Sequence, residues 1–396
     1  MCIRDSSAPV PASSDRSFFR PTATSGAALT VVALPSFLLG AFAPSIKEDV
    51  GFGDAGLGAV FTIGFLVSAV ILQFSGAAAD RSGPQRVIRM GLVLAAIGAV
   101  ALGTLVTSLV MLVVAFSLNR AAEAVVQPAT NTLVSEAVPA RQRGRAMGIK
   151  QSAIPLSTAL AGVAVPVLGG WIGWQGVFLI VAALAIPAWM AVPPTSAPHA
   201  AGAQSRAELW RARHLQVIAL GAAFSAAGVV TVSGFLTTAA KEAGFSEGAA
   251  GLLLTLGGLV MIVSRLVWGA LADRFAFDRF VAVGGAVAVG GLAYLAFATE
   301  SKPWIVVGTA LVFGVGWSWP GLMILGVIER HPNEPGAASA VVQTAVRVGA
   351  LVSPITFGLI ADSAGFRAAW VLPFACALVG ATLLVAGSRV AQPVPA

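Results

Sequence analysis

The chain has 396 residues, of which 57% are hydrophobic and 10% are charged, and its mean hydropathy is +0.87. Soluble domains carry roughly 25% charged residues, so this composition excludes a chain built mainly of soluble domains. The surplus of apolar side chains has to face lipid, which predicts a membrane protein. The net charge of +7 does not indicate nucleic-acid binding here, because membrane proteins gather basic residues in the loops on one side.

Apolar runs of about 20 residues recur along the chain, each long enough to cross a bilayer core of roughly 30 Å. The sequence predicts a first set of six spans at 25–45, 56–78, 87–107, 109–135, 146–168 and 175–193. A second set is predicted at 214–238, 249–270, 280–299, 304–327, 338–361 and 369–388. The expected organisation is a disordered tail at 1–24, an N-terminal bundle at 25–193, a Pro- and Ser-rich linker at 194–213, a C-terminal bundle at 214–388 and a tail at 389–396.

Basic residues are unequally divided between the two sides that these spans define. The tails, the linker and the even-numbered loops hold 17 Lys and Arg residues, and the odd-numbered loops hold 4. Because Lys and Arg concentrate in cytoplasmic loops, both termini are expected to face the cytoplasm. The chain is expected to be a multi-pass protein of the inner (plasma) membrane.

The two halves repeat each other at a nearly constant offset. The sequence GFGDA at 51–55 matches GFSEG at 244–248, and GAAADR at 76–81 matches GALADR at 269–274. A duplicated unit with an even number of spans keeps its orientation, so the copies should be related by an axis along the membrane normal. The sequence therefore predicts an all-α membrane protein of twelve helices in two pseudo-symmetric six-helix bundles, with a site between them.

The loop between the second and third predicted spans carries the most specific motif. It reads Gly76-x3-Asp80-Arg81-x-Gly83-x2-Arg86, with Ala78 and Pro84-Gln85 at positions where this pattern usually has Leu and basic residues. With Arg120 in the fourth span, it resembles the major facilitator superfamily over residues 25–390. The resemblance implies the fold of that family, alternating access, a small-molecule substrate and a monomer in the lipid bilayer.

The same resemblance implies a conformational gate at the cytoplasmic surface, which clasps the halves together when that side is closed. Glu136, at the end of the fourth span, is the expected partner of Arg81 or Arg86. The expected gate residues are Gly76, Asp80, Arg81, Gly83, Arg86, Glu136, Asp273 and Arg274.

Arg120 and Glu123 lie three residues apart in the fourth span, so they share one face of the helix. Ionisable side chains at membrane depth are costly and face a cavity or a partner. One interpretation is that Arg120 binds an anionic group of the substrate and Glu123 takes up a coupling proton. The alternative is a mutual ion pair that only holds the bundle together.

Other polar and aromatic residues inside spans are candidates for substrate binding. Arg347 lies about 13 Å into the eleventh span, too deep to reach the interface easily, whereas Arg265 is expected to reach it by snorkelling. Gln151 and Gln343 are symmetry mates, for which cavity lining and helix joining both stay open. Trp317 and Trp319 either wall the cavity or pack in the core. The expected substrate-binding residues are Arg120, Arg347, Gln151, Gln343, Trp317 and Trp319.

These residues predict proton-coupled uptake of a small organic anion by a secondary transporter. One alternative is a proton-coupled drug exporter that uses Glu123, although the antiporter signature of the fifth span is only partial, with Val165-Pro166 where Gly-Pro is expected. An alternative of another class is a non-transporting membrane receptor or assembly protein. The sequence contains no nucleotide-binding loop, metal-ligand spacing or nucleophile motif, so we expect no enzyme activity, cofactor, metal or nucleic-acid partner.

Overall fold

The computed structural model describes residues 13–139, 142–194, 211–331 and 335–390, and within these ranges it contains helices and no strands. In chain order the elements are α1 (Ser13–Ala41), α2 (Ala43–Val50), α3 (Asp54–Ser82), α4 (Pro84–Thr104), α5 (Leu109–Ala137), α6 (Arg143–Gln151), α7 (Ala153–Ala164), the π-helical turn η2 (Val165–Gly169), α8 (Gly170–Ala191), α10 (Arg213–Glu242), α11 (Glu247–Arg274), α12 (Arg279–Ala298), α13 (Lys302–Leu311), the π-helical turn η3 (Val312–Gly316), α14 (Pro320–Arg330), α15 (Pro335–Ala369) and α16 (Val371–Arg389).

Eleven helical segments of the described chain are long and apolar enough to cross a membrane. They cover all twelve predicted spans, because the segment Arg145–Ala191 contains two of them. Its helix is broken at Gly173, whose φ of 65° and ψ of 175° are not helical. Only glycine adopts this region of φ/ψ at little cost, so Gly173 allows the chain to turn between two antiparallel spans.

Helix α1 begins at Ser13, so the expectation of a disordered tail is wrong for residues 13–24. Thr22 and Thr24 are buried, and the Thr22 hydroxyl donates a hydrogen bond of 2.6 Å to the carbonyl of Phe18. A hydroxyl that bonds to a carbonyl of its own helix can be buried without an unmet polar group. The predicted linker is described only at its two ends, and α10 begins at Arg213.

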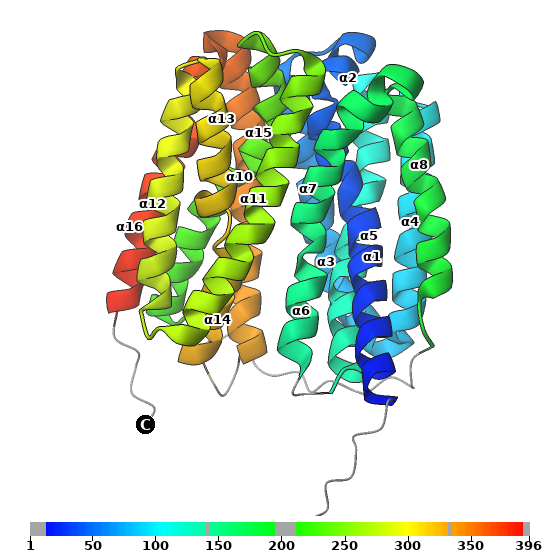
Figure 1. The fold of residues 1–396 in the computed structure, drawn as a ribbon, viewed down its shortest axis with the longest axis vertical. Coiled ribbons are helices and arrows are strands. Elements are labelled where there is room, and N and C mark those ends of the chain that lie inside the picture. The colour runs from blue at the N-terminus through cyan, green and yellow to red at the C-terminus, as the bar shows by residue number, and fades with distance from the viewer. Residues whose placement is uncertain (1–12, 140–141, 195–210, 332–334, 391–396) are drawn as a thin grey trace, which may run out of the picture.

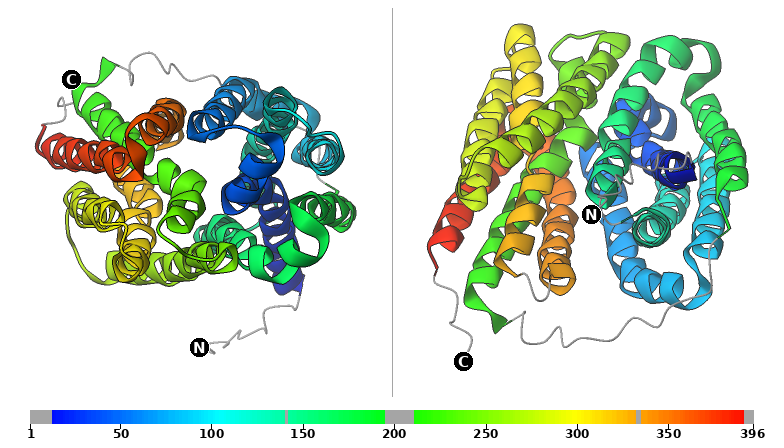
Figure 2. Two further views of the ribbon diagram at one scale, coloured as in Figure 1. Left: turned by 90° about the horizontal axis from the view of Figure 1, so that it is seen from above. Right: turned by 60° about the horizontal axis from the view of Figure 1, so that its bottom comes forward.

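The helices form two bundles side by side, α1–α8 and α10–α16, as Figures 1 and 2 show. The bundles meet mainly through three helix pairs: α3 with α15, α7 with α11 and α1 with α10. At Gly58 of α3 a Cβ atom would overlap the carbonyl of Pro354, and at Gly40 of α1 it would overlap the carbonyl of Ser233. Glycine therefore allows the backbones of the two bundles to touch.

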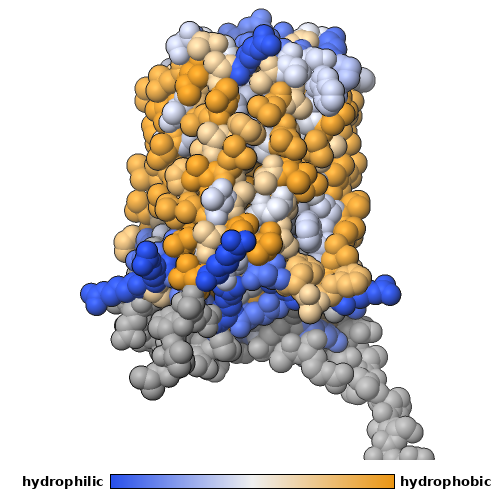
Figure 3. Space-filling model, turned by 90° about the vertical axis from the view of Figure 1, so that its left-hand side faces the viewer, coloured by the Kyte–Doolittle hydropathy of each residue, from blue (hydrophilic) through white to orange (hydrophobic). Residues whose placement is uncertain are grey.

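We call the end of the molecule that carries α2 the upper end, and the end where α1 begins the lower end (Figure 1). The ribbons of the two bundles converge at the upper end and diverge toward the lower end (Figures 1 and 2). Hydrophobic side chains dominate the flank of the molecule between two more hydrophilic ends (Figure 3). Such an apolar belt is the surface that a helical membrane protein presents to lipid.

Candidate functional site

One face of α5 carries four polar residues near the middle of the molecule. Arg120, Glu123, Gln127 and Asn131 follow each other at helical spacing, so their side chains lie along one side of the helix. Arg120 and Glu123 are buried, Gln127 is half-buried and Asn131 is exposed. Arg120 and Glu123 were predicted from the sequence, whereas Gln127 and Asn131 were not, although their helical spacing places them on the same face.

Arg120 forms an ion pair with Glu123 through its Nη1 atom. The same atom donates a hydrogen bond of 2.8 Å to the Ser36 hydroxyl of α1, and the guanidinium lies 4.4 Å from the ring centroid of Phe65. An aromatic face and a carboxylate both stabilise a desolvated guanidinium. The structure therefore contains the predicted pair, in a form in which each charge compensates the other.

Arg347 of α15 reaches from the second bundle to the first. Its Nη2 donates a hydrogen bond of 2.7 Å to Gln127 Oε1, and its Nη1 lies 3.5 Å from the Ser68 hydroxyl of α3. The Arg347 guanidinium also interacts electrostatically with Glu123 and Arg120. Among the described residues, its hydrogen-bond acceptors are neutral oxygens only.

Lys150 of α6 is fully buried, although it was counted with the loop cations in the sequence analysis. Its Nζ donates to the Gln127 backbone carbonyl at 3.2 Å and to Asn131 Oδ1. Lys150 should not have been among the 17 basic residues of the tails, linker and even-numbered loops, because it lies inside the predicted span 146–168. A lysine within an apolar span is itself a signal for a buried polar contact.

Arg265 of α11 forms a second polar contact between the bundles. Its Nη1 donates a hydrogen bond of 3.0 Å to the Gln151 carbonyl, so Arg265 has a partner in the other bundle that the sequence did not predict. The side chains of Gln151 and Gln343 are both exposed. Gln343 lies one turn from Arg347 on α15, so these two residues share a face of that helix.

The two tryptophans flank a break between η3 and α14, where residues 317–319 are not helical. The Trp317 ring lies 6.3 Å from that of Phe37 in the first bundle and 5.5 Å from that of Phe313. Trp319 is buried, and its indole Nε1 has no hydrogen-bond partner among the described residues. Trp317 thus lies against an aromatic ring of the other bundle, whereas Trp319 is a buried core residue.

The predicted gate residues lie at the lower end. Gly83 has a φ of 81° between α3 and α4, a conformation that favours glycine. Arg81, Arg86, Glu136 and Arg274 are exposed. In the described part of the chain no ion pair joins Glu136 to Arg81 or Arg86. The side-chain surroundings of Gly76, Asp80 and Asp273 lie outside what the structure describes.

The upper end is held by contacts that the sequence analysis missed. The Asp362 carboxylate of α15 accepts hydrogen bonds from the backbone N–H groups of Asp54 and Ala55, at 2.7 and 2.8 Å. These groups begin α3, so Asp362 caps a helix of the opposite bundle. Ser45 of α2 bonds to Glu247 of α11, which adds a further polar contact between the bundles at this end.

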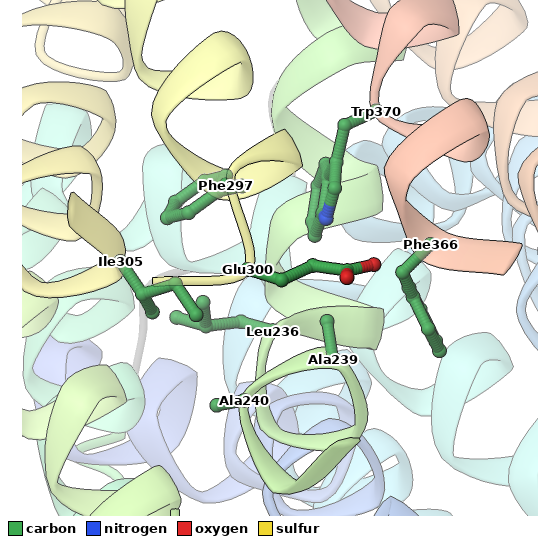
Figure 4. A pocket seen from close by; sticks show the side chains of 8 residues that line it. All are labelled: Leu236, Ala239, Ala240, Phe297, Glu300, Ile305, Phe366 and Trp370. Atoms are coloured by element: carbon green, nitrogen blue, oxygen red, sulfur yellow. The ribbon is translucent and has the colours of Figure 1, made fainter. Parts of the chain in front are cut away.

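Two cavities lie away from the basic residues of α5, α6 and α15. The one in Figure 4 is lined by Glu300, Phe297 and Trp370 among others, and its volume of about 10 Å³ has room for about one water molecule. The other, of about 420 Å³, lies at the upper end and is lined by residues of both bundles, including Asp49 and Glu247. Neither cavity contains Arg120, Lys150 or Arg347 in its lining.

Comparison with known proteins agrees with this architecture. The family model described as Major Facilitator Superfamily matches residues 26–354 and, in a second match, 218–395. The chain belongs to this superfamily. It is 29% identical over 343 residues to the chloramphenicol resistance protein of Streptomyces lividans, covering 83% of this chain and 86% of that one. It is 24% identical over 265 residues to human monocarboxylate transporter 11, covering 62% and 56%.

Solved structures of transporters in this superfamily share the fold. A bacterial homologue of the human lysosomal transporter Spinster, in an inward-facing and unoccupied conformation, superposes with a TM-score of 0.75 at 16% identity, covering 96% of this chain and 98% of that chain. The nucleoside transporter NupG superposes with a TM-score of 0.76 at 14% identity, covering 94% and 99%. The superfamily membership makes this chain a multi-pass membrane transporter, with a small-molecule substrate and a lipid environment.

Proposed function

We propose that this superfamily member is a secondary active transporter that moves a small organic anion into the cell together with protons. The observation that carries the proposal is Arg347, a cation in the middle of the bundle that is hydrogen-bonded only to neutral oxygens. A desolvated charge without a counter-ion is costly. An anionic substrate would give Arg347 a directly bonded counter-ion, so this site favours anions over cations.

Glu123 is the proposed proton carrier. In the structure it neutralises Arg120, and that pair has no net charge. Protonation of Glu123 removes the counter-ion of Arg120, which then becomes a second ligand for an anion. Binding of a proton to Glu123 and binding of the anion to Arg120 therefore favour each other, which couples the two binding steps.

The proposed working cycle rocks the two bundles about this site. Most Lys and Arg residues of the chain, Lys150 not among them, lie in the tails, linker and even-numbered loops, which supports a cytoplasmic lower end in the inner (plasma) membrane. The polar contacts of Asp362 and Glu247 then close the extracellular end in the state described. The gate residues Asp80, Arg81 and Glu136 would engage only when the lower end closes.

The first test is thermal unfolding of the purified protein with a panel of small carboxylates and lipophilic cations. A ligand at about 100 times its Kd stabilises the folded state by about 2.7 kcal/mol. We expect carboxylates to raise the Tm of the parent and of Arg367→Gln, an exposed control on the same helix, but not that of Arg347→Gln. Stabilisation by carboxylates that persists in Arg347→Gln would contradict the proposal.

A second candidate is proton-coupled export of drugs. It is favoured by the similarity to the chloramphenicol resistance protein and by the similarity, 28% over 160 residues, to multidrug resistance protein Stp of Mycobacterium tuberculosis. In that case Glu123 would exchange a proton for the drug. Stabilisation by lipophilic cations in the parent, lost in Glu123→Gln and kept in Arg347→Gln, would support export and argue against anion uptake.

A further inference from the structure

Three cations meet around the middle of α5, and only one of them has a carboxylate partner. Arg120 is paired with Glu123, whereas Lys150 and Arg347 donate only to neutral oxygens within the described structure. The two unpaired cations share a single residue, Gln127. Lys150 bonds to its backbone carbonyl and Arg347 to its side-chain carbonyl.

This arrangement leaves Lys150 and Arg347 without a carboxylate in hydrogen-bond contact, and Arg347 interacts with the Glu123 carboxylate only at longer range. Hydrogen bonds to amide oxygens orient a cation but do not neutralise it, and two like charges close together also repel each other. Arg265 is a further cation in this region, because it donates a hydrogen bond to the carbonyl of Gln151, the residue after Lys150. A ligand with one negative charge would compensate only one of them.

We infer that the transported anion carries two separate negative groups, one bound by Arg347 and the other by Lys150. The inference rests on the proposed function and names its substrate class, a short dicarboxylate. The two donors hold opposite ends of Gln127, which favours two charged groups joined by a short chain over a single carboxylate. Gln127 and Asn131 then act as the acceptors of the empty site, and the substrate carboxylates replace their oxygens.

The burial of these residues indicates how the second group is reached. Lys150 is fully buried, and Asn131, which accepts its hydrogen bond, is exposed. Binding of a substrate carboxylate at Lys150 therefore requires Asn131 Oδ1 to release the ammonium group. Arg347 is half-buried and needs only to release Gln127 Oε1.

The experiment compares malonate, succinate, glutarate and adipate with the monocarboxylates of the same chain lengths. Calorimetry on the full-length purified protein gives the Kd of each probe. We expect the best dicarboxylate to bind at least about tenfold more tightly than its monocarboxylate. In Lys150→Gln the dicarboxylate should fall to the affinity of the monocarboxylate, whose own binding through Arg347 should change by less than about twofold.

A second variant keeps the lysine in case Lys150→Gln does not fold. Asn131→Asp places a carboxylate beside Lys150, and we expect it to remove the dicarboxylate preference in the same way. Lys302→Gln, at an exposed lysine of the upper end, is the matched control and should retain the preference. Each of the three substitutions lowers the net charge by one, so a general effect of charge would change the dicarboxylate preference of all three variants alike.

The outcomes separate this inference from the function on which it rests. Equal or tighter binding of monocarboxylates by the parent, with dependence on Arg347, would overturn the dicarboxylate assignment and leave anion transport standing. A dicarboxylate preference that survives both Lys150→Gln and Asn131→Asp would overturn the role of Lys150. Binding of lipophilic cations with no carboxylate bound at all would overturn both the inference and the proposed function.

Discussion

The carboxylate of Asp362 caps the first turn of α3 by accepting a hydrogen bond of 2.7 Å from the backbone N–H of Asp54 in the opposite bundle. The residue that caps the N-terminus of a helix usually lies directly before that helix in the chain. Here the cap comes from α15, so it exists only while the upper ends of the two bundles touch. The capping energy is therefore available to stabilise one conformational state over another.

We expect Asp362→Ala to weaken closure of the upper end. Loss of an N-cap costs about 1 kcal/mol, which changes the ratio of closed to open states about fivefold. Cross-linking of Glu48→Cys to Lys241→Cys with a short bifunctional maleimide, in a background without the native cysteines, would report closure, because Glu48 Oε2 and Lys241 Nζ lie 3.8 Å apart across the bundles. Ser363→Ala is the control, since this exposed hydroxyl bonds only to carbonyls of its own helix. Undiminished cross-linking in Asp362→Ala would refute this role.

Substitution of Glu123 should uncouple the anion from the proton. Glu123→Gln leaves Arg120 without its counter-ion, so anion binding should no longer depend on pH and a pH gradient should no longer drive uptake. Exchange of labelled for unlabelled anion across the membrane needs no net proton movement and should persist. Reconstituted vesicles measure both activities. Glu136→Gln, at an exposed carboxylate, should behave as the parent in binding pH dependence. Uptake in Glu123→Gln that still follows the pH gradient would refute the assignment.

Gln127 should contribute to stability as well as to the site. It accepts hydrogen bonds from Lys150 and Arg347, and Gln127→Leu removes the acceptor of Arg347. An unsatisfied buried donor costs about 1–3 kcal/mol, with more for a charged group, so the Tm should fall clearly. Gln73→Leu, at an exposed glutamine of α3, should leave the Tm nearly unchanged. Equal Tm values for the two variants would show that the Arg347–Gln127 bond is not important for stability.

Close backbone contact at the upper end should be sensitive to a single side chain. In Gly58→Val the new atoms would overlap the backbone of Pro354 and Ile355, so the upper end could not close fully. Transport requires both the closed and the open state of the upper end, so we expect the transport rate of Gly58→Val to fall at least about tenfold. The cross-linking of Glu48→Cys to Lys241→Cys described above should fall as well. Gly285→Val, where a Cβ meets no neighbour within 4 Å, should keep the parent rate. A normal rate in Gly58→Val would contradict the closure model of transport.

The sequence predicted the class of fold because that class follows from solvation. A span of apolar residues must be helical in lipid, and the repeat of Gly76–Arg81 at Gly269–Arg274 gave the symmetry of the halves. The start of α1 was missed because residues 13–24 look polar. Their threonines are buried in the helix, and one of them bonds to a helix carbonyl, a contact that hydropathy does not measure.

The site could be predicted only in part. Arg120, Glu123 and Arg347 could be predicted as site residues because a charge within an apolar span is costly unless it faces a cavity or a partner. Lys150 was assigned to a loop, since its place near the end of a span left two explanations for its charge. The cap at Asp362 could not be read at all, because Asp362 and Asp54 are 308 residues apart and meet only in the folded chain.

The sequence by itself therefore determined the membrane class, the spans, the repeat and the depth of Arg120, Glu123 and Arg347, because each depends on the water-to-lipid transfer of local segments. Only the tertiary structure decided which partners the cations have outside their own helix. Arg120 meets Glu123 within one helix, but Arg347 meets Gln127 across the two bundles, and Lys150 meets the same glutamine from a third helix. Charge pairing depends on distance in space, and distance between bundles is fixed by packing rather than by position along the chain.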